Sequence, residues 1–538
     1  MNSAGAASFL IAILSAGQVL AQAPVLPADS GANAGKLLNR NGLPNLGDGS
    51  DMTLGAERRL GDRIARSLYR DLDYVDDPVI SDYLQGIWQP LLAAARERGE
   101  LPADMDEAYA WEIWMSRDRT VNAFALPGAY FGMHLGLIAT VSNHAELASV
   151  MAHELSHVTQ RHISRMMSRQ SAQAPWMIGA MILGVLAASK SIDGANAMIM
   201  GGQAAAAQTQ LNFNRDMERE ADRVGYLVAT QAGYAPQGFV TMFEKLQQAS
   251  KLTDNTNFPY LRSHPLSTER MADMQSRIPQ GIGGPTVLVP LEMDHAMVSA
   301  RARVLSKTAV DALLAWNDEA KPAALQRLPL QQQAGVLYGA TLAAAKLRDA
   351  PQAQALLRRL EMVVKDDTAA RNLARLLAAE IQLMQGNPAQ ALVLLQQSPG
   401  ATEPAASPAA MQEVAGQPPM PALVGRAKLF FSAQAATQSG APKTEALQDW
   451  VANHPRDAQA WQLLAHAYVA QARPISAIRA EAEASVAQMD YAAALARLRS
   501  AQDQIRADRA GVDHIEASIV DTRARQIDVL AREQALER

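Results

Sequence analysis

The sequence predicts a mostly α-helical protein with one small β-sheet, followed by an array of paired helices. Three observations favour this fold class. Aromatic residues make up 5 % of the 538 residues and hydrophobic residues 49 %, a composition more typical of helices than of sheet sandwiches. Large apolar residues crowd into short, strand-like runs between residues 109 and 137. Beyond residue 296, alanine-rich helical patterns recur with a spacing of about 35 residues.

Charge and cysteine content narrow the possible functions. The formal net charge is -5 and no strongly basic face is expected, so nucleic acid is not an expected partner. The chain has no cysteine. Any zinc site must therefore use histidine and carboxylate ligands, which suits catalysis better than a structural role.

The first 49 residues are expected to lie outside the folded domains. Residues 1–21 are interpreted as a secretory signal peptide, because an apolar run from Ala6 to Leu20 ends in small residues and is too short to span a membrane. No Lys or Arg precedes this run, and a buried N-terminal helix is the alternative. Residues 22–49 are rich in Ala, Gly, Asn and Pro and are predicted to form a flexible leader.

Residues 50–280 are predicted to form the first folded domain. It begins with two helices, one aligning Leu60, Ile64 and Leu68, and the next running from Ile80 to Leu91. The three candidate strands are Tyr109–Met115, Val121–Leu126 and Tyr130–Leu137, with a turn at Pro127-Gly128. An edge strand can hold an extended peptide by strand addition. We assign this role to Asn122, Ala123 and Phe124, with plain core packing as the alternative.

The next helix carries the central motif of the chain. Asn143 and Glu146 resemble a capping box at its start. His153 to His157 read HExxH, and two histidines four apart lie on one helical face, where both can bind one zinc ion. Glu154 lies beside the expected metal-bound water and can accept its proton. An ordinary surface helix with two histidines is the alternative reading.

Two apolar runs follow the motif, within residues 176–207. Each is too short to cross a bilayer. We expect a hairpin that covers the site, and a membrane-surface contact is the alternative.

A catalytic zinc site needs a third protein ligand and an open fourth position. His162 does not fit the long motif HExxHxxGxxH, which requires glycine at 160 and histidine at 163. The other source is a glutamate on a separate helix, and the predicted helix from Asn214 to Ala232 contains Glu218 and Asp222 on one face.

We therefore expect Glu218 to bind zinc and Asp222 to brace a ligand histidine. Gly225, one turn further on, would let the two helices approach closely. A solvated charged helix face is the alternative.

The segment Asn122–Gly128 (NAFALPG), the HExxH motif and the ExxxD pair formed by Glu218 and Asp222 occur in this order. This order resembles the M48 family of zinc metallopeptidases, especially its secreted bacterial branch with C-terminal tetratricopeptide repeats. The run HELSHVTQRH from His153 is similar to that branch as well.

The resemblance covers residues 50–280 most strongly and implies a zincin-like (gluzincin) fold. It implies one Zn²⁺ per chain, ligated by His153, His157 and Glu218, with Glu154 as the general base.

The same resemblance implies a periplasmic zinc endopeptidase. Its expected partners are unfolded or misassembled outer-membrane proteins and the outer-membrane β-barrel assembly machinery. A chaperone or adaptor with a latent metal site is the alternative function.

A second pattern shared with this branch, HPxxxxR, runs from His264 to Arg270. It implies that His264 is a removable fourth zinc ligand, a latch, whereas the residues alone favour an ordinary loop histidine. Arg270 is expected to anchor the loop through an ion pair with a partner that the sequence does not identify.

The second half of the chain is predicted to be a repeat array. We expect a linker at 281–295, a tetratricopeptide-like domain at 296–508 with a disordered insert at 398–421, and a charged helical tail at 509–538 without an assigned role. Predicted helices include Gly335–Leu347, Ala350–Val363, Ala370–Gln385, Pro388–Gln397, Ala458–Ala472, Pro474–Gln488 and Tyr491–Ile505. Such arrays bind peptides or proteins, and a plain scaffold is the alternative.

Overall fold

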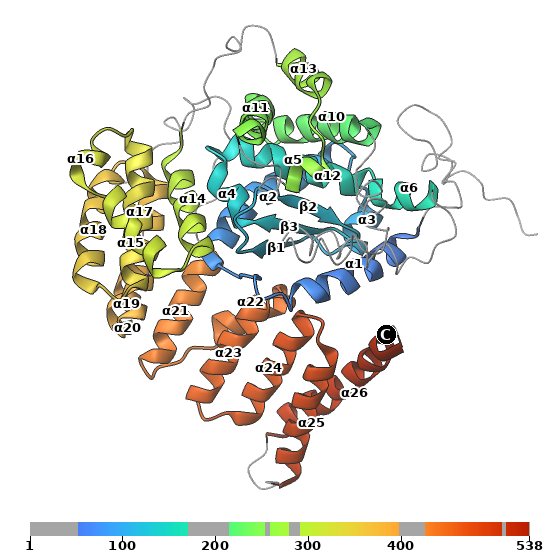
Figure 1. Ribbon diagram of the computed structural model, residues 1–538. Helices are drawn as coiled ribbons and strands as arrows, with labels where there is room; N and C mark the ends of the chain where they lie inside the picture. The colour runs from blue at the N-terminus through green and yellow to red at the C-terminus, as the bar shows by residue number, and fades with distance from the viewer. Residues whose placement is uncertain are drawn as a thin grey trace, which may run out of the picture. The chain divides into compact units, whose positions relative to one another are not determined.

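A computed structural model of the protein describes residues 52–169, 215–252, 259–278, 291–396, 425–507 and 513–536 (Figure 1). The expected signal peptide and leader, the apolar stretch at 176–207 and the insert at 398–421 lie outside these residues. No helix within the described ranges has both the length and the apolar character needed to cross a bilayer.

The predicted fold class is confirmed: within the described residues the chain is mainly helical and contains one small sheet (Figure 1). The helices up to residue 277 are α1 (Leu54–Leu68), α2 (Pro78–Glu97), α3 (Ala103–Ala108), α4 (Leu135–Thr140), α5 (His144–Thr159), α6 (His162–Arg169), α10 (Arg215–Gln231), α11 (Gln237–Leu252), α12 (Pro259–Ser263) and α13 (Thr268–Arg277).

The two expected N-terminal helices are confirmed. In α1 the aligned Leu60, Ile64 and Leu68 are all buried. Helix α2 begins at Pro78, directly after Asp77, whose carboxylate caps the helix by accepting a backbone N–H at 2.9 Å.

The sheet has three strands in the order β1-β3-β2. They are β1 (Glu112–Ser116), β2 (Ala123–Leu126) and β3 (Tyr130–His134), with β1 parallel and β2 antiparallel to β3. Ala123 and Phe124 therefore lie on an outer strand of the described sheet. The third strand was predicted too long, because Leu135–Leu137 form the start of α4. There Gly136 packs under the preceding loop, and a Cβ at this position would lie 2.1 Å from the carbonyl oxygen of Arg119.

Helix α5, which contains the HExxH motif, is buried along its whole length and packs against β2, α10 and α11. The Asn143 side chain caps it by accepting the Glu146 N–H at 2.9 Å. In a capping box the Glu146 carboxylate would accept from the backbone N–H of Asn143 in return. Here it accepts instead from the N–H of Ser142 at 2.7 Å, and it pairs with Lys245 at 2.5 Å.

Helix α10 lies directly against α5. At Gly225 a Cβ would lie 3.1 Å from the carbonyl carbon of Ala152 and from the backbone nitrogen of His153. The close approach expected at Gly225 is therefore present, and it brings the face of α10 that carries Glu218 up to the motif. Gly233 follows the helix with φ 88°, in the left-handed conformation of a C-terminal glycine.

The second half of the described chain is entirely helical, as expected of a repeat array. Its helices are α14 (Met293–Ser306), α15 (Val310–Glu319), α16 (Pro322–Leu325), α17 (Leu330–Lys346), α18 (Ala350–Val363), α19 (Thr368–Met384), α20 (Pro388–Gln396), α21 (Arg426–Gln438), α22 (Glu445–Asn453), α23 (Ala458–Ala470), α24 (Pro474–Ala487), α25 (Tyr491–Ala507) and α26 (His514–Leu536). Sequence neighbours pack as α17 with α18, α19 with α20 and α23 with α24.

At the start of this array one predicted boundary is wrong, and at its end the predicted helical tail is present. Met293–His295, placed in the linker, begin α14, which packs on both α4 and α17. The charged tail forms α26, which packs on α25 and buries Val520 and Ile527. The tail is therefore the last packed helix of the described array.

Candidate metal centre

Four donor groups from three segments converge at the centre of the first domain. His153 and His157 project from α5, Glu218 from the first turn of α10, and His264 directly follows α12. All four side chains are buried, and one ligand atom of each lies within 4.8 Å of the others. The structure thus brings together the predicted ligands and the predicted latch.

The spacing of these atoms fits one zinc ion. The Nε2 atoms of His153 and His157 lie 3.0 Å apart, and each is 3.5 Å from a carboxylate oxygen of Glu218. His264 Nδ1 lies 3.4 Å from His153 Nε2 and 3.1 Å from Glu218 Oε1. Four ligands about 2.1 Å from a tetrahedral zinc lie roughly 3.4 Å from one another. The donor set and its spacing are those of a single-zinc centre.

Glu154 lies at the edge of this group. Both of its carboxylate oxygens are buried without a hydrogen-bond partner among the described residues, and Oε1 is 3.3 Å from Nε2 of His264. A buried carboxylate without partners is costly. It is therefore held ready to accept a hydrogen bond from a group that enters the site.

Asp222 and Arg270 contact the predicted ligands His153 and Glu218. Asp222 Oδ1 lies 3.0 Å from Nδ1 of His153, the arrangement expected of a bracing carboxylate. The sequence does not identify the partner of Arg270. In the structure this partner is Asp222, whose carboxylate accepts from Nε of Arg270 at 2.6 Å and from a second guanidinium nitrogen at 2.8 Å. Arg270 also contacts Glu218 at 2.8 Å and donates to the carbonyl of Pro265 at 2.8 Å. One guanidinium thus links α10 to the loop that carries His264.

Sequence reasoning missed one member of this supporting layer. His162, rejected as a third ligand, has its Nδ1 2.8 Å from Nδ1 of His157. Its Nε2 lies 3.2 Å from Glu220, which also pairs with Arg165 at 2.8 Å. The sequence did contain a signal for this contact, because His162 follows closely after His157. His162 begins α6 directly after the turn that ends α5.

The buried charges set the protonation of the donors. Burial raises the pKa of Glu218, but the imidazoles of His264 and His153 outweigh this and hold it well below its usual range. Burial lowers the pKa of His153, yet hydrogen bonds to Asp222 and Glu218 reverse the shift and raise it to about 9. Burial keeps the pKa of His157 well below its usual value. Metal binding at His153 therefore displaces a proton.

The proposed substrate edge reaches this centre through the His264 segment. The backbone N–H of Tyr260, in α12, donates to the carbonyl of Val121 at 3.3 Å, directly before Asn122. The Tyr260 ring lies 4.7 Å from the His264 ring, centre to centre. Helix α12 thus contacts both the start of β2 and the metal ligands.

Comparison with known proteins bears on this site. Residues 89–278 match the model of Peptidase family M48. A putative beta-barrel assembly-enhancing protease of Vibrio cholerae is 33 % identical over 327 residues, which cover 59 % of this chain and 63 % of the relative. The beta-barrel assembly-enhancing protease of Escherichia coli is 31 % identical over 240 residues, covering 44 % and 47 %.

A more distant relative is the mitochondrial metalloendopeptidase OMA1 of Saccharomyces cerevisiae, 25 % identical over 206 residues, covering 37 % of this chain and 56 % of that protein. The chain thus spans about half to two thirds of the length of these curated relatives. His153, Glu154, His157, Glu218 and His264 all fall within the matched residues 89–278. This part of the chain, with its single-zinc donor set, matches the metallopeptidase domain of family M48.

Proposed function

We propose that this protein is a zinc-dependent endopeptidase of the periplasm that degrades misfolded or stalled outer-membrane proteins. The observation that carries the proposal is the convergence of His153, His157 and Glu218 beside Glu154 within the peptidase-family match. The names of the relatives, which refer to β-barrel assembly, support the substrate class.

The proposed chemistry is hydrolysis of a peptide bond. When bound, zinc polarises the scissile carbonyl and makes a water acidic. Glu154 then accepts the proton of that water and delivers it to the leaving amine. Its buried oxygens support this role, because they form no hydrogen bond within the described residues and the one nearby imidazole, of His264, belongs to the proposed latch. Asp222 and His162 act on the ligands, holding His153 and His157 in orientation.

Substrate is proposed to bind by strand addition to the outer edge of β2, through the backbone of Asn122, Ala123 and Phe124. His264 is proposed to be a latch on the fourth zinc position, which must leave before substrate enters. Its Nδ1 supports this, because it lies at ligand spacing from both His153 and Glu218. The helical array is proposed to dock the target protein or the assembly machinery.

Replacement of Glu154 by Gln is expected to reduce casein hydrolysis by at least about 100-fold, because general-base assistance typically contributes that much. Zinc content, measured by metal analysis, should stay at one ion per chain. The matched control is Glu107→Gln on the exposed face of α3, which should retain full activity. Normal hydrolysis by the Glu154 variant would defeat the mechanism.

The second candidate function is a chaperone or adaptor with a latent metal site. The observation that favours it is the place of His264, whose ligand atom lies within 4.8 Å of those of the three proposed ligands, where it would close the centre. Full restoration of outer-membrane assembly by the inactive Glu154 variant, in cells lacking the wild-type protein, would support this function instead.

A further inference from the structure

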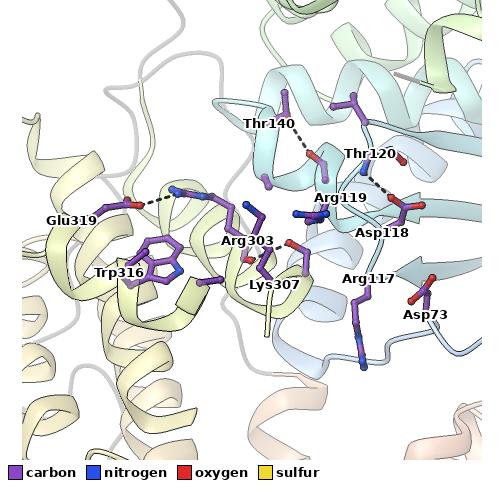
Figure 2. A pocket seen from close by; sticks show the side chains of 16 residues that line it. Asp73, Arg117, Asp118, Arg119, Thr120, Thr140, Arg303, Lys307, Trp316 and Glu319 are labelled. Carbon is purple, nitrogen blue, oxygen red and sulfur yellow. Dashed lines mark hydrogen bonds and ion pairs between the residues drawn. The ribbon is translucent and has the colours of Figure 1, made fainter. Parts of the chain in front are cut away.

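A polar cleft with a volume of about 990 Å³ lies beside the sheet, away from the metal ligands named above (Figure 2). One wall is the loop of residues 117–121, which joins β1 to β2, together with one side of α4. The opposite wall is the end of α14 and one face of α15. The peptidase domain and the first helices of the array thus build this cleft jointly.

The lining of the cleft carries more positive than negative charge, since four cationic side chains accompany the carboxylates of Asp73, Asp118 and Glu319. Arg117, Arg119 and Lys307 line it, are exposed and form no ion pair within the described residues. Figure 2 shows Arg119 on the loop and Lys307 at the end of α14 reaching into the space between the two walls. Placing like charges on facing walls is unfavourable unless an anion lies between them. This local excess contrasts with the net charge of -5 of the whole chain.

The other charged groups of the cleft belong mainly to its walls. Arg303 lies over the Trp316 ring, 4.4 Å from its centre, and pairs with Glu319 at 3.3 Å. Asp118 accepts the N–H of Thr120 at 2.8 Å and shapes the loop. These contacts fix the walls and leave the guanidinium of Arg119 and the ammonium of Lys307 for a ligand.

The cleft lies next to the start of the proposed substrate strand. Val121 is part of its lining, and Asn122–Phe124 follow directly along the edge strand β2. An extended peptide advances about 3.3 Å per residue. A substrate paired with this edge needs only a few further residues to run past Val121 into the cleft.

We propose that this cleft binds a carboxylate of the polypeptide substrate, on a stretch that extends beyond the part paired with β2. Arg119 and Lys307 are the binding groups, and Arg117 adds positive charge at the rim. The inference rests on the proposed peptidase function and adds to it a preference for substrates with an acidic residue, or a chain end, at a set distance from the scissile bond.

The test compares four peptides with one scissile sequence. Both flanks carry Glu or both carry Gln, and the C-terminus is a free acid or an amide. With the full-length, zinc-loaded protein, kcat/KM for the carboxylate peptides is expected to exceed that for the neutral peptides by about five- to tenfold, which is the range for one carboxylate on two partly exposed cations. The excess should shrink at 0.5 M salt. If the excess in kcat/KM depends on Glu, the cleft binds a side-chain carboxylate. If it depends on the free acid, the cleft binds the chain end.

The variants Arg119→Gln and Lys307→Gln should each reduce this excess, and the double variant should abolish it while the neutral peptides are cleaved as before. Arg119→Glu should shift the preference to a peptide with Lys in place of Glu. The matched controls are Arg506→Gln on α25 and Lys365→Gln after α18, both on exposed surface. Thermal unfolding of each variant checks that the fold is intact.

Binding of the same labelled peptides to the Glu154→Gln protein, measured by fluorescence anisotropy, separates this inference from the peptidase proposal. If the protein binds carboxylate peptides more tightly but the wild type hydrolyses none of them, the peptidase proposal is wrong and the cleft assignment stands. Equal affinity and equal cleavage of acidic and neutral peptides, or a preference that survives in the double variant, would overturn the cleft assignment.

Discussion

His264 is the residue on which the proposed control of the site depends. Its Nδ1 lies at ligand distance from the other donors, while its Nε2 faces Glu154 at 3.3 Å. One imidazole therefore meets both groups that the proposed hydrolysis requires to be free, the fourth zinc position and the general base.

We predict that His264→Ala raises the kcat/KM of casein hydrolysis while zinc stays bound through the three remaining ligands. A latch favoured by about 1.4 kcal/mol leaves about one molecule in ten open, so its removal would raise turnover about tenfold. The matched control is His466→Ala on the exposed face of α23. Unchanged or lower activity would identify an ordinary loop histidine.

At this scale the sequence predicts what depends on local spacing. His153 and His157 share a face because they lie one helical turn apart, and the same rule pairs Glu218 with Asp222. The partner of Arg270 could not be predicted, because Asp222 lies 48 residues earlier and only folding brings the two together. The role of His162 was missed for a similar reason, since it contacts the side of His157 that faces away from the metal.

Among the elements, the contact of α5 with α10 decides whether a site exists. Both proposed histidine ligands lie on α5 and the proposed carboxylate ligand on α10, so the distance between the helices sets the distance between the donors. Gly225 is the residue that permits this distance, because a Cβ there would meet the backbone of Ala152 and His153 at 3.1 Å.

We predict that Gly225→Val pushes α10 away from α5, weakens zinc binding and lowers the free energy of unfolding by about 1–3 kcal/mol, the usual cost of overpacking. Zinc titration and urea unfolding measure the two effects. Gly55→Val is the matched control, since a Cβ at Gly55 in α1 meets only the end of the Arg59 side chain, at 3.5 Å. Full zinc affinity in the Gly225 variant would show that the close approach is unnecessary.

Helices with an apolar stripe were predicted closely, and α18 runs from Ala350 to Val363 as expected. Helix α14 was not predicted, although it is central to the packing. Its buried face includes Asp294, His295 and Arg301, which look like surface residues in the sequence. Their burial is possible only because partners on other helices neutralise them.

For the whole molecule, these buried charges connect the peptidase domain with the array. Arg301 of α14 binds Asp77 before α2 at 2.8 Å and Glu380 of α19 at 2.7 Å. Arg426 of α21 binds Asp76 at 2.7 Å and Asp457 at 2.7 Å. Removing one partner of a buried pair is costly, so these links favour joint folding of both halves.

The third link lies at the start of the metal helix and depends on pH. His144 Nδ1 lies 2.6 Å from Glu292 and its Nε2 lies 3.2 Å from Asp294, at the beginning of α14. Burial lowers the pKa of His144, but the hydrogen bonds to Asp294 and Glu292 outweigh it and raise the pKa to about 10. The neighbouring His295 stays neutral over the same range, because burial lowers its pKa to about 4.

The folded pKa of His144 thus lies above its usual value of 6.5, so the charged pair stabilises the fold fully below pH 6.5 and is lost as the pH rises through about 10. We predict that the difference in unfolding free energy between wild type and His144→Gln is largest at or below pH 6.5. It should fall by about 1.4 kcal/mol per pH unit between pH 7 and 10. Urea unfolding at several pH values measures it, with His514→Gln on the exposed start of α26 as the control. A difference that is constant over this range, or that grows with pH, would show that His144 is neutral in the folded protein and that the α5–α14 junction is held by packing alone.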